Sequence, residues 1–147
     1  MTTTSYASLS DKLQTSFQYG EHTVTFTADY LAKQANASIL VQMGETCVHV
    51  AISTAAAAAD VDFLPLMVTA VRRHYSNGQI AGGYIKRETT RGTEDEVLLA
   101  RLIDRSIRPL FPEGFRDEVQ VYCYIMSVDP NVSPDVPAFL GVSAALA

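Results

Sequence analysis

The sequence predicts an α+β fold, in which strands precede and follow one long amphipathic helix. Three observations support this class: apolar residues alternate in short runs across residues 17–71, a capped helical pattern covers residues 93–107, and a further alternating run covers residues 119–128. With 147 residues, 48% of them hydrophobic and 18% charged, the chain can bury a core. No apolar run approaches the roughly 20 residues of a membrane-spanning helix, which argues against a membrane protein.

Strands are predicted wherever β-branched and aromatic residues alternate with polar ones. Gly44 and Glu45 separate two such runs and predict a hairpin between them. Pro65 stands at the start of another run, where proline is tolerated. Residues 55–62 are expected to form a loop with solvated acids. The predicted strands are residues 17–19, 23–26, 39–43, 46–52, 63–71 and 119–128.

The first helix is predicted from Thr93 to Ile107. Thr93 can accept a hydrogen bond from the amide of Glu96, and the Glu96 carboxylate can reach back to Thr93, which is a capping box. Three acidic residues in the first turn suit the positive end of the helix dipole. The helix is predicted to stop before Pro109. Upstream of the helix, the glycine-rich segment at residues 76–83 predicts a turn.

The two ends of the chain have different compositions. Residues 1–16 are rich in Ser and Thr and are expected to form a flexible lead-in to a domain of residues 17–147. They lack the apolar segment of a secretory signal. At the other end, Pro130, Pro134 and Pro137 predict a loop before an apolar helix at residues 139–147. Because this helix stops in mid-pattern, the sequence is expected to be a fragment of a larger fold.

Two cysteines, Cys47 and Cys123, each lie within an apolar strand-like run. They are too few for a disulfide framework, so we expect two buried free thiols in a reducing compartment. The expected location is the cytoplasm, with the mitochondrial matrix as the alternative.

The positive charge is concentrated in the middle of the chain. The net charge is −5, yet nine of the eleven Lys and Arg residues lie between Arg72 and Arg116. With six acidic residues that stretch has a net charge of +3, and the remainder, with two cations and ten acids, has −8. A basic middle predicts a local anion-binding face, and a solvated charged surface is the alternative.

A stripe of arginines lies on the helix predicted at residues 93–107. At 100° per residue, Arg101, Arg105 and Arg108 share one side of the helix, and apolar residues share the other. Guanidinium groups bind phosphate oxygens in a bidentate fashion, so the stripe is a candidate phosphate-binding surface. An internally paired face is the alternative, since Asp104 can pair with Arg101 or Arg108. The apolar side is predicted to comprise Leu99, Ala100, Leu102, Ile103 and Ile107.

A second candidate contact follows Gly82 and Gly83. Tyr84, Lys86 and Arg87 place one aromatic ring and two cations on a glycine-hinged loop. Single-stranded nucleic acid is bound in this way, with a base stacked on the ring and cations near the backbone. The alternative is an ordinary strand end.

Other chemistry has little support in the sequence. His22, His49 and His74 have no metal-ligand spacing, and His49 is expected to be structural within its strand. There is no nucleophile elbow and no phosphate-binding loop of the GxxxxGK type.

The fifteen-residue run from Arg101 to Phe115, RLIDRSIRPLFPEGF, closely resembles the signature of the first RNase PH-like core of the polynucleotide phosphorylase family. Other segments resemble the family in the same order, so that the resemblance extends over about residues 17–147. These segments are FQYGEHTV at 17–24, FLPL at 63–66, IAGGYIKRE at 80–88, VQV at 119–121, PD at 134–135 and GVSAA at 141–145.

The resemblance implies a β-α-β-α RNase PH-like core, of which this chain supplies the incomplete N-terminal half. It implies a polyribonucleotide nucleotidyltransferase, a phosphorolytic 3′–5′ exoribonuclease that reversibly converts RNA and phosphate to nucleoside diphosphates. Mg²⁺, with ligands outside this chain, is the implied cofactor, and inorganic phosphate is the co-substrate. The implied partners are single-stranded RNA, two further copies in a homotrimeric ring of the full-length protein, and an RNA-degradation complex.

The family's phosphate and metal sites belong to its second core, so the resemblance implies no catalytic residue and no metal ligand here, and the chain alone is expected to be inactive. Tyr84, Lys86 and Arg87 match the family's channel loop. Ile85 replaces its second aromatic residue, so base stacking would depend on Tyr84. The alternative is a non-catalytic RNase PH-like subunit that binds RNA or has a structural role in an exosome-type ring.

Overall fold

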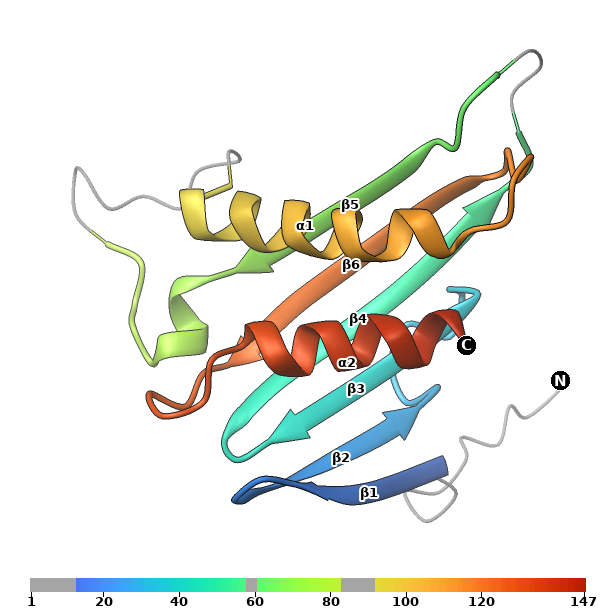
Figure 1. Ribbon diagram of the computed structural model, residues 1–147. Helices are drawn as coiled ribbons and strands as arrows, with labels where there is room; N and C mark the ends of the chain where they lie inside the picture. The colour runs from blue at the N-terminus through green and yellow to red at the C-terminus, as the bar shows by residue number, and fades with distance from the viewer. Residues whose placement is uncertain (1–12, 58–60, 83–91) are drawn as a thin grey trace, which may run out of the picture.

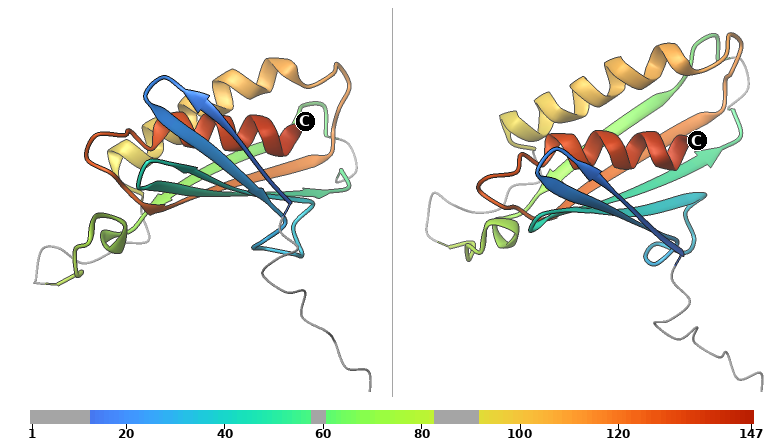
Figure 2. Two further views of the ribbon diagram at one scale, coloured as in Figure 1. Left: turned by 90° about the horizontal axis from the view of Figure 1, so that it is seen from below. Right: turned by 60° about the horizontal axis from the view of Figure 1, so that its bottom comes forward.

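The computed structural model describes residues 13–57, 61–82 and 92–147, and it confirms the α+β class and the β-α-β-α order (Figure 1). Strands form one six-stranded sheet, and Figure 2 shows both long helices on the same side of it. The strands are β1 (Leu13–Tyr19), β2 (His22–Ala28), β3 (Ala37–Met43), β4 (Thr46–Ala55), β5 (Leu66–Arg72) and β6 (Glu118–Ser127). The helices are η1 (His74–Asn77), α1 (Glu94–Ile107), η2 (Arg108–Leu110) and α2 (Asp135–Leu146).

The strand order is β1-β2-β3-β4-β6-β5, so β5 lies at an edge of the sheet. Neighbouring strands are antiparallel except β5 and β6, which are parallel. A parallel pair requires a crossover connection, and α1 belongs to it. This crossover places α1 beside β5, at the open edge.

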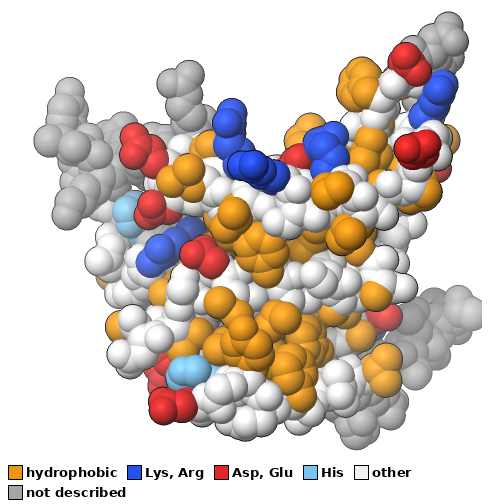
Figure 3. Space-filling view, in the orientation of Figure 1, with side chains coloured by type: hydrophobic (Ala, Val, Ile, Leu, Met, Phe, Trp, Pro, Cys, Tyr) orange, Lys and Arg blue, Asp and Glu red, His pale blue; other side chains and the backbone are white. Residues whose placement is uncertain are grey.

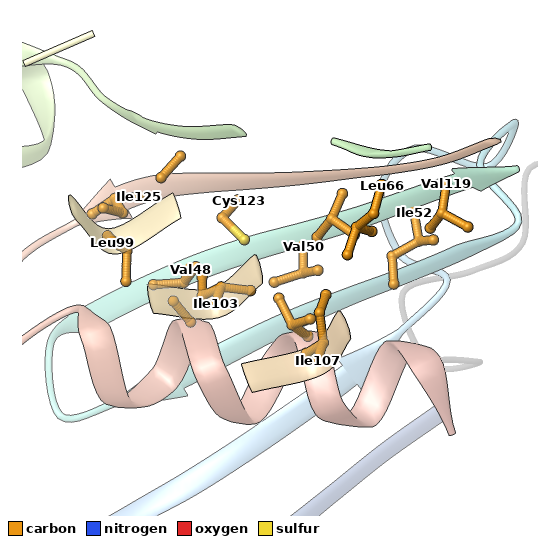
Figure 4. Close-up of a cluster of buried hydrophobic side chains, with 14 residues drawn as sticks. Val48, Val50, Ile52, Leu66, Leu99, Ile103, Ile107, Val119, Cys123 and Ile125 are labelled. Atoms are coloured by element: carbon orange, nitrogen blue, oxygen red, sulfur yellow. The ribbon is translucent and has the colours of Figure 1, made fainter. Parts of the chain in front are cut away.

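The core lies between the sheet and the helices. Alternate residues of β4 and β6 point toward the helices, as the strand period of two requires, and α1 contributes Leu99, Ile103 and Ile107 (Figure 4). These three residues are spaced four apart and lie along one narrow stripe of α1. The sheet residues of this cluster include Val48, Val50, Ile52, Val119, Val121, Cys123 and Ile125.

Helix α2 begins at Asp135, four residues before the predicted start at Phe139. The expectation that Pro137 belongs to a loop was wrong, because a proline in the first helical turn sacrifices no intrahelical hydrogen bond. The Ala138 N–H already donates to the Pro134 carbonyl at 3.1 Å. Further along, Gly141 rests against β3 and β4: a Cβ added there would lie 2.8 Å from Val50 Cγ2 and 2.9 Å from Val41 Cγ2.

Two strands start three or more residues away from their predicted starts. Strand β1 begins at Leu13 and not at residue 17, because its whole length pairs with β2, from Leu13 opposite Ala28 to Tyr19 opposite His22. Strand β5 begins at Leu66 and not at Phe63, which is exposed. The predicted hairpin of β3 and β4 is confirmed, and Gly44 makes its turn at a φ of 60°.

The buried polar groups within the sheet are structural. Burial raises the pKa of Cys123 to about 12, and the half-buried Cys47 thiol has its pKa raised by the same cause. His49 contacts the Ser38 hydroxyl at 3.0 Å, and burial lowers the pKa of its imidazole. The predicted position of His49 within a strand is confirmed, and its side chain is buried. Both cysteines are free thiols, but only Cys123 is buried as predicted, because Cys47 is partly exposed.

Candidate nucleic-acid interface

Helix α1 is fixed at its N-terminus by the predicted capping box. The Thr93 hydroxyl accepts a hydrogen bond from the Glu96 N–H, and the Glu96 carboxylate accepts from the Thr93 N–H. The other carboxylate oxygen of Glu96 accepts from the backbone N–H of Arg72, at the end of β5. Glu96 is nearly buried. One side chain thus both starts the helix and ties it to the edge strand.

The solvent side of α1 displays two arginines that have no partner among the described residues. Because Leu99, Ile103 and Ile107 face the sheet, Arg101 and Arg105 point outward, and both are exposed. Neither forms a hydrogen bond or an ion pair within the described part of the chain. Lys and Arg side chains gather over α1 in Figure 3. Both guanidinium groups are therefore available to an anionic ligand.

Arg108 has a different role from the other two arginines. Its guanidinium forms an ion pair with Asp104 at 2.7 Å and donates to the carbonyls of Leu64 at 3.1 Å and Leu66 at 3.3 Å. The hydrogen bond to Asp104 raises the pKa of the Arg108 guanidinium. The predicted stripe of three equivalent arginines therefore divides into two without partners in the described ranges and one, Arg108, that contacts the start of β5.

We expect Arg108→Ala to lower the free energy of unfolding by about 1–2 kcal/mol, because two backbone carbonyls and one carboxylate lose a charged donor. Arg105→Ala is the matched control and should change stability by less than about 0.5 kcal/mol. Urea denaturation of both variants measures this difference. Equal stabilities would contradict an anchoring role for Arg108.

The apolar side of α1 is narrower than predicted. Leu102 was expected in the core, but it is 51% exposed, and Leu98 is 64% exposed. Both line a hollow of about 440 Å³ that also contains Arg72 and Asp135. Arg72 was predicted only as one of the nine cations of the basic middle, and its position at a strand end gave no sequence signal for this hollow. Its Nη2 donates to Asn77 Oδ1 at 2.8 Å, so this cation is partly engaged.

The second predicted contact, formed by Tyr84, Lys86 and Arg87, lies outside the described residues and stays a prediction. Within the described ranges, no group of three or more His, Cys, Asp or Glu residues fits a metal ion. Ser38 and His49 touch, but both are buried within the sheet, away from the arginine face. In the part of the chain that the structure describes, each helix is too short or too polar to cross a bilayer.

Comparison with known proteins supports an RNase PH-like fold. Residues 21–147 match the family described as the 3′ exoribonuclease family, domain 1. A chain of the Archaeoglobus fulgidus exosome with RNA bound to the active site is similar at a TM-score of 0.63 and 24% identity, over 84% of this chain and 50% of that chain.

Two further structures have the same fold. Rice (Oryza sativa) Rrp46 matches at a TM-score of 0.60 and 17% identity, over 84% of this chain and 52% of that one. A chain of an archaeal exosome core matches at a TM-score of 0.55 and 24% identity, over 84% of this chain and 47% of that one. The chain therefore spans about half the length of these proteins.

Proposed function

The chain belongs to the 3′ exoribonuclease family, of which it represents domain 1, and from this premise we propose that it is the RNA-guiding first domain of a phosphorolytic 3′–5′ exoribonuclease of the polynucleotide phosphorylase type. The observation that carries the proposal is the pair of exposed guanidinium groups of Arg101 and Arg105 on α1, which have no partner within residues 13–57, 61–82 and 92–147. The run from Arg101 to Phe115, which resembles the signature of the polynucleotide phosphorylase family, supports this type of enzyme.

In the proposed reaction, an oxygen of inorganic phosphate attacks the phosphorus of the last 3′ linkage of RNA. The bond from this phosphorus to the 3′ oxygen of the preceding nucleotide breaks. A nucleoside diphosphate leaves, and the RNA is one nucleotide shorter. Because the resemblance implies that the phosphate and metal sites belong to the family's second core, the proposal places Mg²⁺ and the catalytic groups of the complete enzyme there.

The role proposed for this domain is to hold the RNA backbone. Arg101 and Arg105 lie one helical turn apart on the same exposed face, and guanidinium groups bind phosphate oxygens without reading sequence. The complete protein is proposed to form a homotrimeric ring and to act in an RNA-degradation complex. The similarity to exosome chains supports a ring of this general type.

An assay of the complete enzyme with a 3′-terminal oligo(A) tests this proposal. We expect ADP as the product, and we expect its release to require inorganic phosphate. The 147-residue chain alone should release no ADP above a blank. AMP as the product would instead show hydrolysis, and an inactive complete protein that still binds RNA would favour the non-catalytic subunit of an exosome-type ring.

Tyr84 gives a prediction for the loop. If a base stacks on its ring, Tyr84→Ala should weaken binding of a 20-nucleotide oligo(A) by about 1–3 kcal/mol, which is roughly 5- to 150-fold in Kd. Tyr19→Ala removes an exposed ring from β1 and is the control. Fluorescence anisotropy measures the Kd of both variants for the oligo(A). If phosphorolysis of a dinucleotide falls as much as that of the 20-mer, the loop has a structural role only.

A further inference from the structure

The open edge of the sheet runs along β5, and its hydrogen-bonding groups can be assigned. The Val119 N–H donates to the Pro65 carbonyl at 3.0 Å, so Pro65 faces β6. In a parallel ladder, alternate residues direct both backbone groups to the neighbouring strand. Leu66, Val68, Ala70 and Arg72 therefore direct their N–H and C=O groups away from the sheet.

Helix α1 satisfies the two ends of this edge. The Arg108 guanidinium donates to the Leu66 carbonyl, and the Glu96 carboxylate accepts from the Arg72 N–H. Between these ends, the outward N–H and C=O groups of Val68 and Ala70 form no hydrogen bond among the described residues. An edge strand leaves a row of backbone groups unpaired, and the contacts at its two ends narrow this row on β5 to a short window of two donors and two acceptors.

The window opens into a hollow of about 360 Å³ between β5 and α1. Val68, Thr69 and Ala70 form one wall, and Val97 and Ala100 belong to the helix wall. Peptide-binding domains that add a strand use an exposed sheet edge of this kind: the ligand backbone pairs with the edge, and pockets receive alternate side chains. The hollow has both features.

The charges around the hollow indicate which peptide fits. Three charged side chains line it, namely Glu96, Asp104 and Arg101. Glu96 is engaged with Thr93 and Arg72, and Asp104 is paired with Arg108. Arg101 has no partner among the described residues. Glu96 keeps its negative charge, but its oxygens already accept three hydrogen bonds, whereas the donors of Arg101 are unused among the described residues. An acidic side chain on the ligand can pair with these donors.

We propose that the hollow between β5 and α1 binds an extended acidic peptide segment of another polypeptide, which adds a seventh strand to the sheet beside Val68 and Ala70. An extended peptide fits this window better than RNA, because its backbone repeats donors and acceptors at the spacing of a neighbouring strand, whereas RNA phosphates only accept and RNA donors belong to its 2′-hydroxyls and bases. This inference goes beyond the proposed RNA function and stands without it, although Arg101 belongs to both surfaces.

The test is amide hydrogen exchange of the 147-residue chain, followed by NMR, with an acetylated and amidated octapeptide of alternating valine and aspartate as the probe. We expect the Val68 and Ala70 amides to exchange at least tenfold more slowly when the peptide is bound. The matching valine–lysine octapeptide should bind at least tenfold more weakly. An unchanged exchange rate at Val68 and Ala70 would overturn the proposal, and protection by oligo(A) instead would assign the hollow to RNA.

Val68→Pro provides the matched variant. Proline is tolerated at an edge position whose N–H points outward, so the β5–β6 ladder is kept while the outward donor is removed. Peptide binding should fall at least tenfold relative to Val68→Thr, which keeps the N–H. Equal binding by the two variants would contradict strand addition. If Val68→Pro does not fold, Arg101→Glu replaces it, and this variant should prefer the lysine peptide.

Discussion

Glu96→Ala is expected to lower the free energy of unfolding by about 2–4 kcal/mol, because it removes a helix cap and leaves a backbone N–H of the edge strand without its acceptor. The Glu96 carboxylate accepts from the N–H groups of Thr93 and Arg72 and from the Thr93 hydroxyl at 3.1 Å. Since Glu96 is 8% exposed, water cannot readily replace these bonds. Urea denaturation measures the loss.

Glu94→Ala is the matched control, since Glu94 is an exposed acid in the same first turn. Its loss removes only an interaction with the helix dipole, about 0.3–1 kcal/mol. If Glu96→Ala and Glu94→Ala have equal effects, Glu96 does not join α1 to β5. Glu96→Gln keeps the shape of the side chain but presents an amide to one of the two N–H groups. The loss in free energy of unfolding should therefore lie between the losses of Glu96→Ala and Glu94→Ala.

Gly141→Val is expected to destabilise the protein by about 3 kcal/mol, because its side chain has no space between α2 and the sheet. Even a single Cβ would lie within 2.9 Å of methyl groups of Val50 and Val41, and both valines are fully buried. Their side chains cannot move away without displacing the core. Thermal denaturation should show a lower Tm at an unchanged helix content.

Ser143→Val, at an exposed position of the same helix, is the control for helix propensity and should change stability by less than about 0.5 kcal/mol. A Gly141→Val variant as stable as Ser143→Val would mean that α2 does not approach the sheet this closely. Gly141→Ala should have an intermediate effect, since it adds the clashing Cβ alone.

The features that were predicted from the sequence are those set by neighbouring residues. The hairpin of β3 and β4 follows from two alternating runs around Gly44, and the capping box follows from Thr93 and Glu96 at a spacing of three. Both depend on hydrogen bonds or pairings within a few residues. The same locality explains why α1 was placed to within one residue of its observed start.

The features that were missed depend on contacts between distant segments. The carbonyls that Arg108 binds precede it by 44 and 42 residues, so its anchoring role has no local signal. Leu102 was assigned to the core by helical periodicity, but the apolar residues that α1 buries are Leu99, Ile103 and Ile107, with Ala100 packed beside them. The start of α2 was misplaced because a proline suits both a loop and a first helical turn.

The candidate site was predicted in part. The positions of Arg101 and Arg105 on the exposed side of α1 follow from helical geometry, whereas their freedom from internal partners depends on Asp104 choosing Arg108. The sequence allowed Asp104 to pair with Arg101 or with Arg108. The tertiary contacts of Arg108 with Leu64 and Leu66 decide the choice, because they hold its guanidinium beside Asp104.

We propose that Arg101 and Arg105 contact RNA phosphates, whereas Arg108 stabilises the fold. The salt dependence of RNA binding tests this difference most directly. For single strands, each phosphate contact contributes about 0.7 to the slope of log K against log salt concentration. We predict that Arg101→Ala with Arg105→Ala reduces the slope for oligo(A) binding by about 1.4, and that Arg108→Ala leaves it unchanged while lowering stability. An unchanged slope in the double variant would contradict the account.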